Sequence, residues 1–139
     1  MLDFIVGNEN ELINNLDYIP KTAFVIVESE KGYMLVYNKY FKHWELAGGT
    51  MEEGETPRDC AIRECKEESN QNISELKFIG VAKYSWMNAA LYYTFLKEEE
   101  PFIENEEISE MMWWKPGDEV AESIDTESIK MIELIELNK

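Results

Sequence analysis

The stretch GGTMEEGETPRDCAIRECKEESN, from Gly48 to Asn70, decides how this chain folds. It begins with two glycines, crosses an acidic loop and enters a segment with clear helix signals. Thr56 is a good N-cap residue, and Pro57 suits the first helical position. No further proline and no glycine interrupts the run to Ser69, and Asn70 tolerates the left-handed conformation that ends many helices. The sequence therefore predicts a helix over Pro57–Ser69.

Three glutamates, Glu64, Glu67 and Glu68, fall within about 100° of arc on one face of this helix. Like charges one turn apart repel each other by a few tenths of a kcal/mol per pair, which a solvated surface can bear. On these residues alone, a solvated face is the simpler interpretation. The alternative is a bound divalent cation, because Mg²⁺ and Mn²⁺ prefer carboxylate oxygens, water and phosphate as ligands.

The spacing around the glutamates favours the cation. Gly49 is followed after five residues by Glu55, and after seven more by the run RECKEE that starts at Arg63. This pattern resembles the Nudix box, G-x5-E-x7-R-E-U-x-E-E-x-G-U, in which U is a bulky aliphatic residue. The glycine and polar positions that agree are Gly49, Glu55, Arg63, Glu64, Glu67 and Glu68. By this resemblance the chain is identified as a member of the Nudix hydrolase family.

Three positions depart from the family pattern. Cys65 replaces an aliphatic residue, which a small buried thiol can do. Asn70 stands where the family has glycine, and Gln71 stands where it has an aliphatic residue. The departures concern the exit from the helix and leave the carboxylates intact.

The resemblance implies a metal site on the helix. By position, Glu64, Glu67 and Glu68 look like the ligands of Mg²⁺ or Mn²⁺. Glu55 and Gly49 look like structural residues of the box, with Glu55 holding the loop through an ion pair to Arg63.

The resemblance also implies catalytic roles but leaves the general base open. Glu64 serves as the base in some relatives, and Arg63 would orient a glutamate. Other relatives take the base from a downstream acidic loop, which here offers Glu104, Glu106 and Glu107. We prefer Glu107 among these and take Glu64, Arg63 and Glu107 as the catalytic candidates.

The rest of the chain predicts an α/β fold. Strands are expected at 4–6, 22–28, 33–37, 76–84, 89–96 and 110–114, a turn or short helix at 9–17, and a last helix at 127–137 capped by Asp125 or Thr126. The apolar run at 22–28 suits a central strand. Gly48 and Gly49 should let the backbone come close to a ligand. The order of elements agrees with the Nudix-type α/β/α sandwich, a mixed sheet between helices, that the resemblance implies.

Length and charge limit the function further. The 139 residues suit one domain over 1–139, and the net charge of −16 opposes binding to nucleic-acid polymers or anionic membranes. Neither a signal peptide nor a membrane span is recognisable, so we expect a cytoplasmic protein. Cys60 and Cys65 should point apart on one helix and stay reduced. The sequence does not fix the oligomeric state, and a homodimer is one possibility.

The function implied by the resemblance is Mg²⁺-dependent hydrolysis of a diphosphate bond in a nucleoside diphosphate linked to another group. The WELAGG approach at 44–49 slightly favours nucleoside triphosphates, with nucleotide sugars or ADP-ribose as alternatives. A non-catalytic nucleotide sensor is a second possibility, although such domains usually lose box glutamates. An acidic interaction protein would leave Gly49, Glu55 and Arg63 unexplained. No substrate-binding residue is identified; the aromatic candidates for base stacking are Trp86, Tyr92, Tyr93, Trp113 and Trp114.

Overall fold

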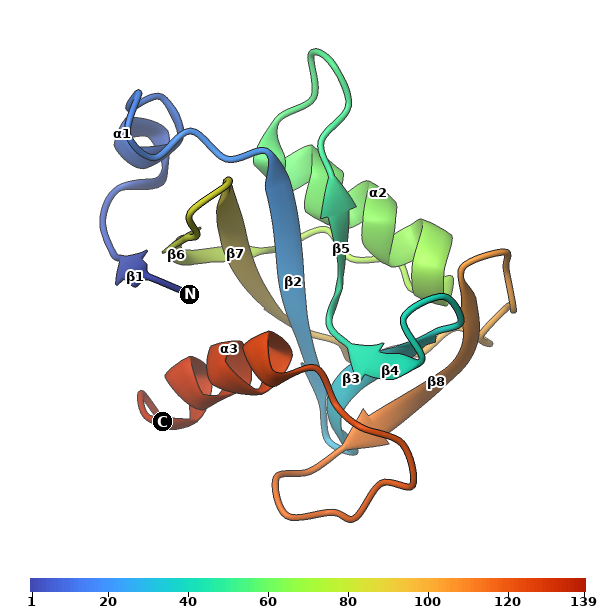
Figure 1. The fold of residues 1–139 in the computed structure, drawn as a ribbon. Coiled ribbons are helices and arrows are strands. Elements are labelled where there is room, and N and C mark those ends of the chain that lie inside the picture. The colour runs from blue at the N-terminus through green and yellow to red at the C-terminus, as the bar shows by residue number, and fades with distance from the viewer.

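The computed structural model describes all 139 residues as one mixed sheet with three helices (Figure 1). The strands are β1 (Asp3–Ile5), β2 (Thr22–Ser29), β3 (Gly32–Asn38), β4 (His43–Glu45), β5 (Ala47–Thr50), β6 (Lys77–Lys83), β7 (Asn88–Phe95) and β8 (Ile108–Trp114). The helices are α1 (Glu9–Ile13), α2 (Pro57–Ser69) and α3 (Thr126–Glu136). None of the three helices combines the length and the hydropathy that crossing a membrane requires.

The apolar strand β2 is the centre of the sheet, as predicted. The strand order is β1-β6-β7-β2-β3-β4, with β5 paired to β2 and β8 paired to β3. β2 and β7 run parallel, in register from Thr22 opposite Ala89 to Glu28 opposite Phe95, and the other pairs are antiparallel. Because β2 is covered on both faces, its run TAFVIVES can be apolar almost throughout.

The two faces of the sheet have separate cores. One core contains Val25 and Val27 of β2 together with Cys60, Ala61 and Cys65 of α2. The other contains Ile26 of β2 together with Met131 and Ile132 of α3. Alternate residues of β2 therefore face different helices, and α2 and α3 cover opposite faces (Figure 1). This is the predicted α/β/α sandwich.

Helix α2 begins and ends at the predicted residues. The Thr56 side chain accepts a hydrogen bond from the Asp59 N–H at 3.1 Å, which satisfies one of the free donors of the first turn. At the other end Asn70 has φ of 64°, and its N–H donates to the carbonyl of Lys66. Both cysteines of the helix are buried and free, as expected.

The structure shows why glycine is needed at two strands of the sheet. β6 is irregular between Phe78 and Gly80, and a Cβ at Gly80 would lie 2.4 Å from the carbonyl oxygen of Ile5. Gly48 and Gly49 lie within strand β5, and the space beside them is filled by protein atoms. A Cβ at Gly48 would lie 2.5 Å from the carbonyl oxygen of Ala23, so this glycine lets β5 approach β2.

Candidate metal centre and active site

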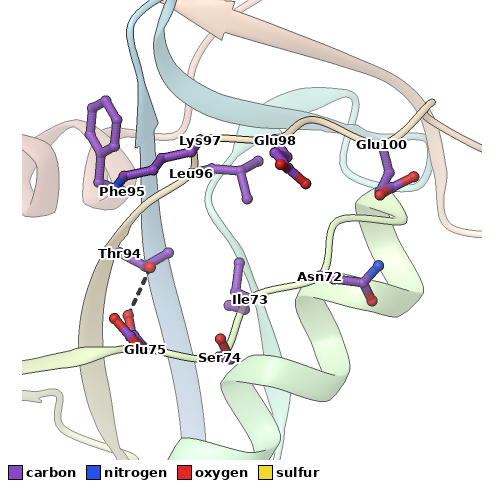
Figure 2. Close-up of a pocket in the computed structure, with 10 residues that line it drawn as sticks. All are labelled: Asn72, Ile73, Ser74, Glu75, Thr94, Phe95, Leu96, Lys97, Glu98 and Glu100. Atoms are coloured by element: carbon purple, nitrogen blue, oxygen red, sulfur yellow. Dashed lines mark hydrogen bonds between the residues drawn. The ribbon is translucent and has the colours of Figure 1, made fainter.

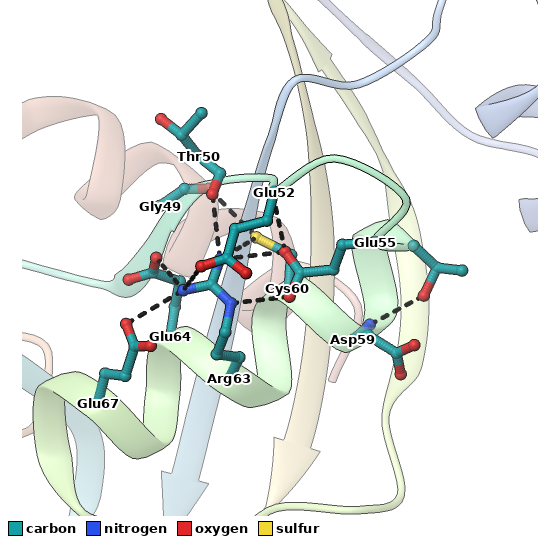
Figure 3. A network of polar contacts seen from close by, with 10 residues as sticks. Gly49, Thr50, Glu52, Glu55, Asp59, Cys60, Arg63, Glu64 and Glu67 are labelled. Carbon is teal, nitrogen blue, oxygen red and sulfur yellow. Dashed lines mark hydrogen bonds and ion pairs between the residues drawn. The ribbon is translucent and has the colours of Figure 1, made fainter.

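Arg63 is the hub of the polar network on α2 (Figure 3). Its guanidinium donates two hydrogen bonds to Glu55, at 2.7 and 3.0 Å, and this is the ion pair expected from the sequence. It also donates to Glu64 at 2.8 Å, to Glu67 at 3.1 Å and to the carbonyl of Thr50 at 3.1 Å. The bidentate contact lowers the pKa of Glu55 to about 2, so Glu55 stays charged and the loop before α2 stays tied to the helix.

Glu64 is held between Arg63 and Gly49. Its side chain is only 13% exposed, and a Cβ added at Gly49 would lie 2.5 Å from its carboxyl carbon. Because Gly49 has no side chain, the Glu64 carboxylate can occupy the space beside it. Burial raises the pKa of Glu64, while the hydrogen bond from Arg63 opposes the rise.

Glu68 is the most deeply buried carboxylate of the helix, with 2% of its surface exposed. It accepts a hydrogen bond from the backbone N–H of Gly48 at 2.8 Å. Burial raises its pKa to about 9, and the neighbouring Glu107 adds to the rise. A group in this position is either protonated or paired with a cation near neutral pH.

Two further carboxylates converge on Glu68. Oxygen atoms of Glu45, Glu68 and Glu107 all lie within 4.8 Å of one another. They come from β4, from α2 and from the loop before β8. Burial also raises the pKa of Glu107, with the charge of Glu45 as a further cause. The three donors are all hard oxygen ligands, and their mutual repulsion would be relieved by a divalent cation, so the residues present fit Mg²⁺ or Mn²⁺.

Asn38 and His43 orient two of these carboxylates. The Asn38 side-chain amide donates to Glu45 at 2.9 Å and to Glu107 at 3.3 Å. A ring nitrogen of His43 lies 2.8 Å from the second oxygen of Glu45. Such supporting contacts hold ligands in place before a metal arrives.

The predicted ligands do not all share one position. Glu68 lies in the convergent cluster, together with Glu107 from the downstream loop. Glu64 and Glu67 instead contact Arg63, and the Glu67 side chain is 57% exposed. Glu45 joins this cluster in the structure but is not among the candidates from the sequence. Its signal was weak but present, because it alternates with the buried Trp44 and Leu46 in the segment just before the glycines.

A cavity of about 390 Å³ opens beside this cluster. It is lined by Tyr40, Glu67, Glu68, Asn105, Glu106 and Glu107. Asn105 shapes one wall, since its amide donates to the carbonyl of Glu68 and its oxygen accepts from the N–H groups of Glu107 and Ile108. The chain thus places an open space directly against the carboxylates.

None of the five aromatic candidates for base stacking lines that cavity. Tyr92 is fully buried and donates to Glu9 at 2.8 Å, while Trp114 is buried and donates to the carbonyl of Asp118. Tyr93 donates to Glu28 and Trp113 to Glu99. Trp86 is exposed but lines a different cavity, of about 380 Å³, with residues of the β6–β7 turn.

Another cavity of about 390 Å³ lies where β7 ends (Figure 2). Its walls are the segments 72–75 and 94–100, which Thr94 joins by donating to the carbonyl of Glu75 at 2.8 Å. It contains no residue of the Nudix-box pattern. We therefore place the candidate site at the cavity beside Glu68.

Comparison with known proteins identifies the family of the chain. The family model of the NUDIX domain matches residues 19–135. A protein of Bacillus subtilis (strain 168) named "Putative 8-oxo-dGTP diphosphatase" is 30% identical over 98 residues, which make up 68% of this chain and 66% of that relative. The chain thus spans just under two thirds of the length of this curated relative.

Solved structures share the fold at low sequence identity. A Bacillus subtilis pyrophosphohydrolase has a TM-score of 0.72 at 16% identity, and the match covers 98% of this chain and 90% of the pyrophosphohydrolase chain. An Ap4A hydrolase of C. elegans has a TM-score of 0.71 at 19% identity, covering 85% and 97%. The NUDIX domain of Shewanella oneidensis NrtR, solved with ADP ribose, has a TM-score of 0.69 at 16% identity, covering 95% and 99%. The match of the NUDIX family model to residues 19–135, most of the chain, shows that the protein belongs to the Nudix hydrolase family.

Proposed function

We propose that the protein is a Mg²⁺- or Mn²⁺-dependent hydrolase that cleaves a diphosphate bond in a nucleotide, with nucleoside triphosphates as the favoured substrates. The observation that carries the proposal is the convergence of Glu45, Glu68 and Glu107, with carboxylate oxygens within 4.8 Å, at a cavity of about 390 Å³. A cavity lined by carboxylates repels a free triphosphate. A bound divalent ion reverses the local sign and so allows an anionic substrate to enter.

Glu45, Glu68 and Glu107 are the residues best placed to hold the ion, with Glu64 and Glu67 on the same helix available as further ligands. When bound, the ion neutralises charge on the phosphate oxygens during hydrolysis. Arg63 fixes Glu64 and Glu67 through its hydrogen bonds, so their carboxylates keep a set orientation. In the reaction, water adds to phosphorus, the bridging P–O bond breaks, and a carboxylate accepts the proton of the water. Glu107 and Glu64 are the two candidates for that base.

The substrate preference rests on sequence and on one relative. The WELAGG segment favours triphosphates, and the similar Bacillus subtilis protein carries an 8-oxo-dGTP diphosphatase name. ADP-ribose and nucleotide sugars form the alternative class, since a NUDIX domain of the same fold was solved with ADP ribose. The second candidate function is a sensor that binds a nucleotide at these carboxylates without cleaving it.

A nucleotide panel tests the proposal. Wild-type protein is assayed with Mg²⁺ for release of phosphate or pyrophosphate from nucleoside triphosphates, 8-oxo-dGTP, ADP-ribose and a nucleotide sugar. Glu68→Gln keeps the shape and can still accept the bond from Gly48, but it removes the charge, so we expect a loss of activity of about 100-fold or more. Glu53→Gln in the exposed loop before α2 is the matched control and should behave like wild type.

Full turnover by Glu68→Gln would rule out the proposed metal site. Tight binding of a nucleotide by the wild type, without cleavage of any member of the panel, would favour the sensor. In both cases Mn²⁺ should be tried beside Mg²⁺, because the same oxygen ligands suit either ion.

A further inference from the structure

Tyr40 is an exposed aromatic residue at the mouth of the candidate site. It lies on the connection between β3 and β4, and 73% of its surface is exposed. It lines the same cavity as Glu68 and Glu107 and is the one aromatic group among the lining residues. The other side chains around the cavity are four glutamates and a hydrogen-bonded asparagine, which offer no flat apolar surface to a ligand.

The backbone around Tyr40 is held in place despite this exposure. The side-chain oxygen of Asn38 accepts hydrogen bonds from the N–H groups of Tyr40, at 2.9 Å, and Phe41, at 3.1 Å. The N–H of Lys42 donates to the carbonyl of Asn38 at 2.8 Å, which closes the turn. The turn is also fastened to the acidic loop, because Lys39 donates its N–H to the carbonyl of Glu107 at 2.9 Å.

Asn38 connects this turn to the carboxylates. Its side chain is buried, and its amide nitrogen donates to Glu45 and Glu107 while its oxygen holds the turn. One residue therefore holds the backbone at Tyr40 and two carboxylates in a set position relative to each other. A tyrosine side chain has only two χ angles, so on this held backbone it loses little conformational entropy when a ligand covers it.

We propose that the ring of Tyr40 stacks on the base of a nucleotide whose phosphates face Glu45, Glu68 and Glu107. The inference rests on the proposed function, which places phosphates at the carboxylates. A nucleotide has a flat apolar base at one end and phosphates at the other, and the cavity offers one aromatic ring and a cluster of metal-binding oxygens. Its volume of about 390 Å³ lies within the usual range for small-ligand sites.

The test measures equilibrium binding, so that it does not depend on turnover. A non-hydrolysable nucleoside triphosphate is titrated into wild type and variants by calorimetry with Mg²⁺ present. Tyr40→Ala should weaken binding by about 5- to 150-fold, the range for loss of one base–aromatic stack, and Tyr40→Trp should retain it. Inorganic tripolyphosphate has no base, so it should bind wild type and Tyr40→Ala equally.

Trp86→Ala is the matched control, because Trp86 is 71% exposed but lines another cavity. It should bind the triphosphate like wild type. If the wild type also hydrolyses the triphosphate, Tyr40→Ala should raise KM and leave kcat largely unchanged, whereas Tyr40→Trp should restore KM.

The outcomes separate the two proposals. Unchanged nucleotide affinity in Tyr40→Ala overturns the stacking role even if the enzyme is active. Equal weakening of nucleotide and tripolyphosphate overturns it as well, since that result shows a disturbed metal site. Weakened binding in Tyr40→Ala without any turnover by the wild type supports stacking and contradicts the proposed hydrolysis.

Discussion

Glu68 shows how the site depends on the position of a single residue. Its carboxylate is almost fully buried and faces two other carboxylates, with the Gly48 N–H as a hydrogen-bond donor. Leaving a charge there without a cation is costly, which is why its pKa rises to about 9 from an ordinary value of 4.5. Helix α2 thus carries a residue that weakens the metal-free protein and gains from a bound ion.

This predicts a pH dependence of stability. The folded metal-free protein binds more protons than the unfolded chain between the two pKa values of Glu68, so its stability should fall as the pH rises from about 4.5 to about 9. Glu68→Gln cannot ionise and should flatten the fall. Thermal unfolding from pH 5 to pH 9 with a chelator present measures it. Parallel curves for wild type and Glu68→Gln would contradict the assignment.

At the scale of elements, the residues at the two ends of α2 determine where the helix begins and ends. Asn70 ends the helix with φ of 64°, a conformation that glycine adopts freely and that costs most other residues about 1–2 kcal/mol. Its side chain also donates to the carbonyl of Pro101 at 2.8 Å. Gln71, the other departure from the family pattern, is buried and exchanges hydrogen bonds with the backbone of Glu100. Polar side chains thus join the end of α2 to the loop after β7.

Two substitutions at Asn70 should separate the contribution of its backbone conformation to stability from that of its side-chain hydrogen bond. Asn70→Gly keeps the conformation and loses one exposed hydrogen bond, so stability should change by less than about 0.5 kcal/mol. Asn70→Ala should lose about 1–2 kcal/mol, because alanine is strained at this φ. Urea unfolding of the two variants measures the difference. Equal losses in both would show that the contact with Pro101 matters more than the conformation.

Features that depend on neighbouring residues could be predicted from the sequence, whereas features that depend on strand pairing could not. The boundaries of α2 follow from Thr56, Pro57 and Asn70, which act on adjacent residues. Glu45 and Tyr40 belong to the local β3–β4 hairpin, but they meet Glu107 only through the pairing of β3 with β8, which joins residues far apart in the chain. Glu107 was placed by family resemblance, and its contact with Asn38 has no local signal.

At the scale of the whole molecule, the high net charge opposes the compact folded state. The chain has 29 acidic and 13 basic residues, and a surface of this kind repels itself. The distance over which charges act falls from about 30 Å in 0.01 M salt to about 8 Å in 0.15 M salt. We therefore expect the melting temperature to rise with NaCl over this range.

The same experiment separates screening from binding. MgCl2 at matched ionic strength should raise the melting temperature further than NaCl, because a bound ion stabilises the folded state in addition to screening. In Glu68→Gln, the melting temperature should still rise with NaCl, but MgCl2 should raise it no further than NaCl does. Identical NaCl and MgCl2 curves for the wild type would show that there is only screening.

The parallel pairing of β2 with β7 has a consequence for synthesis of the chain. β2 is complete at Ser29, but the strand that covers one of its edges ends only at Phe95. Until then the nascent chain carries an apolar strand with an open edge, and such edges attract other strands. Contacts between distant segments also slow folding. We therefore expect β2, the strand that becomes the centre of the finished sheet, to be a site of aggregation during translation.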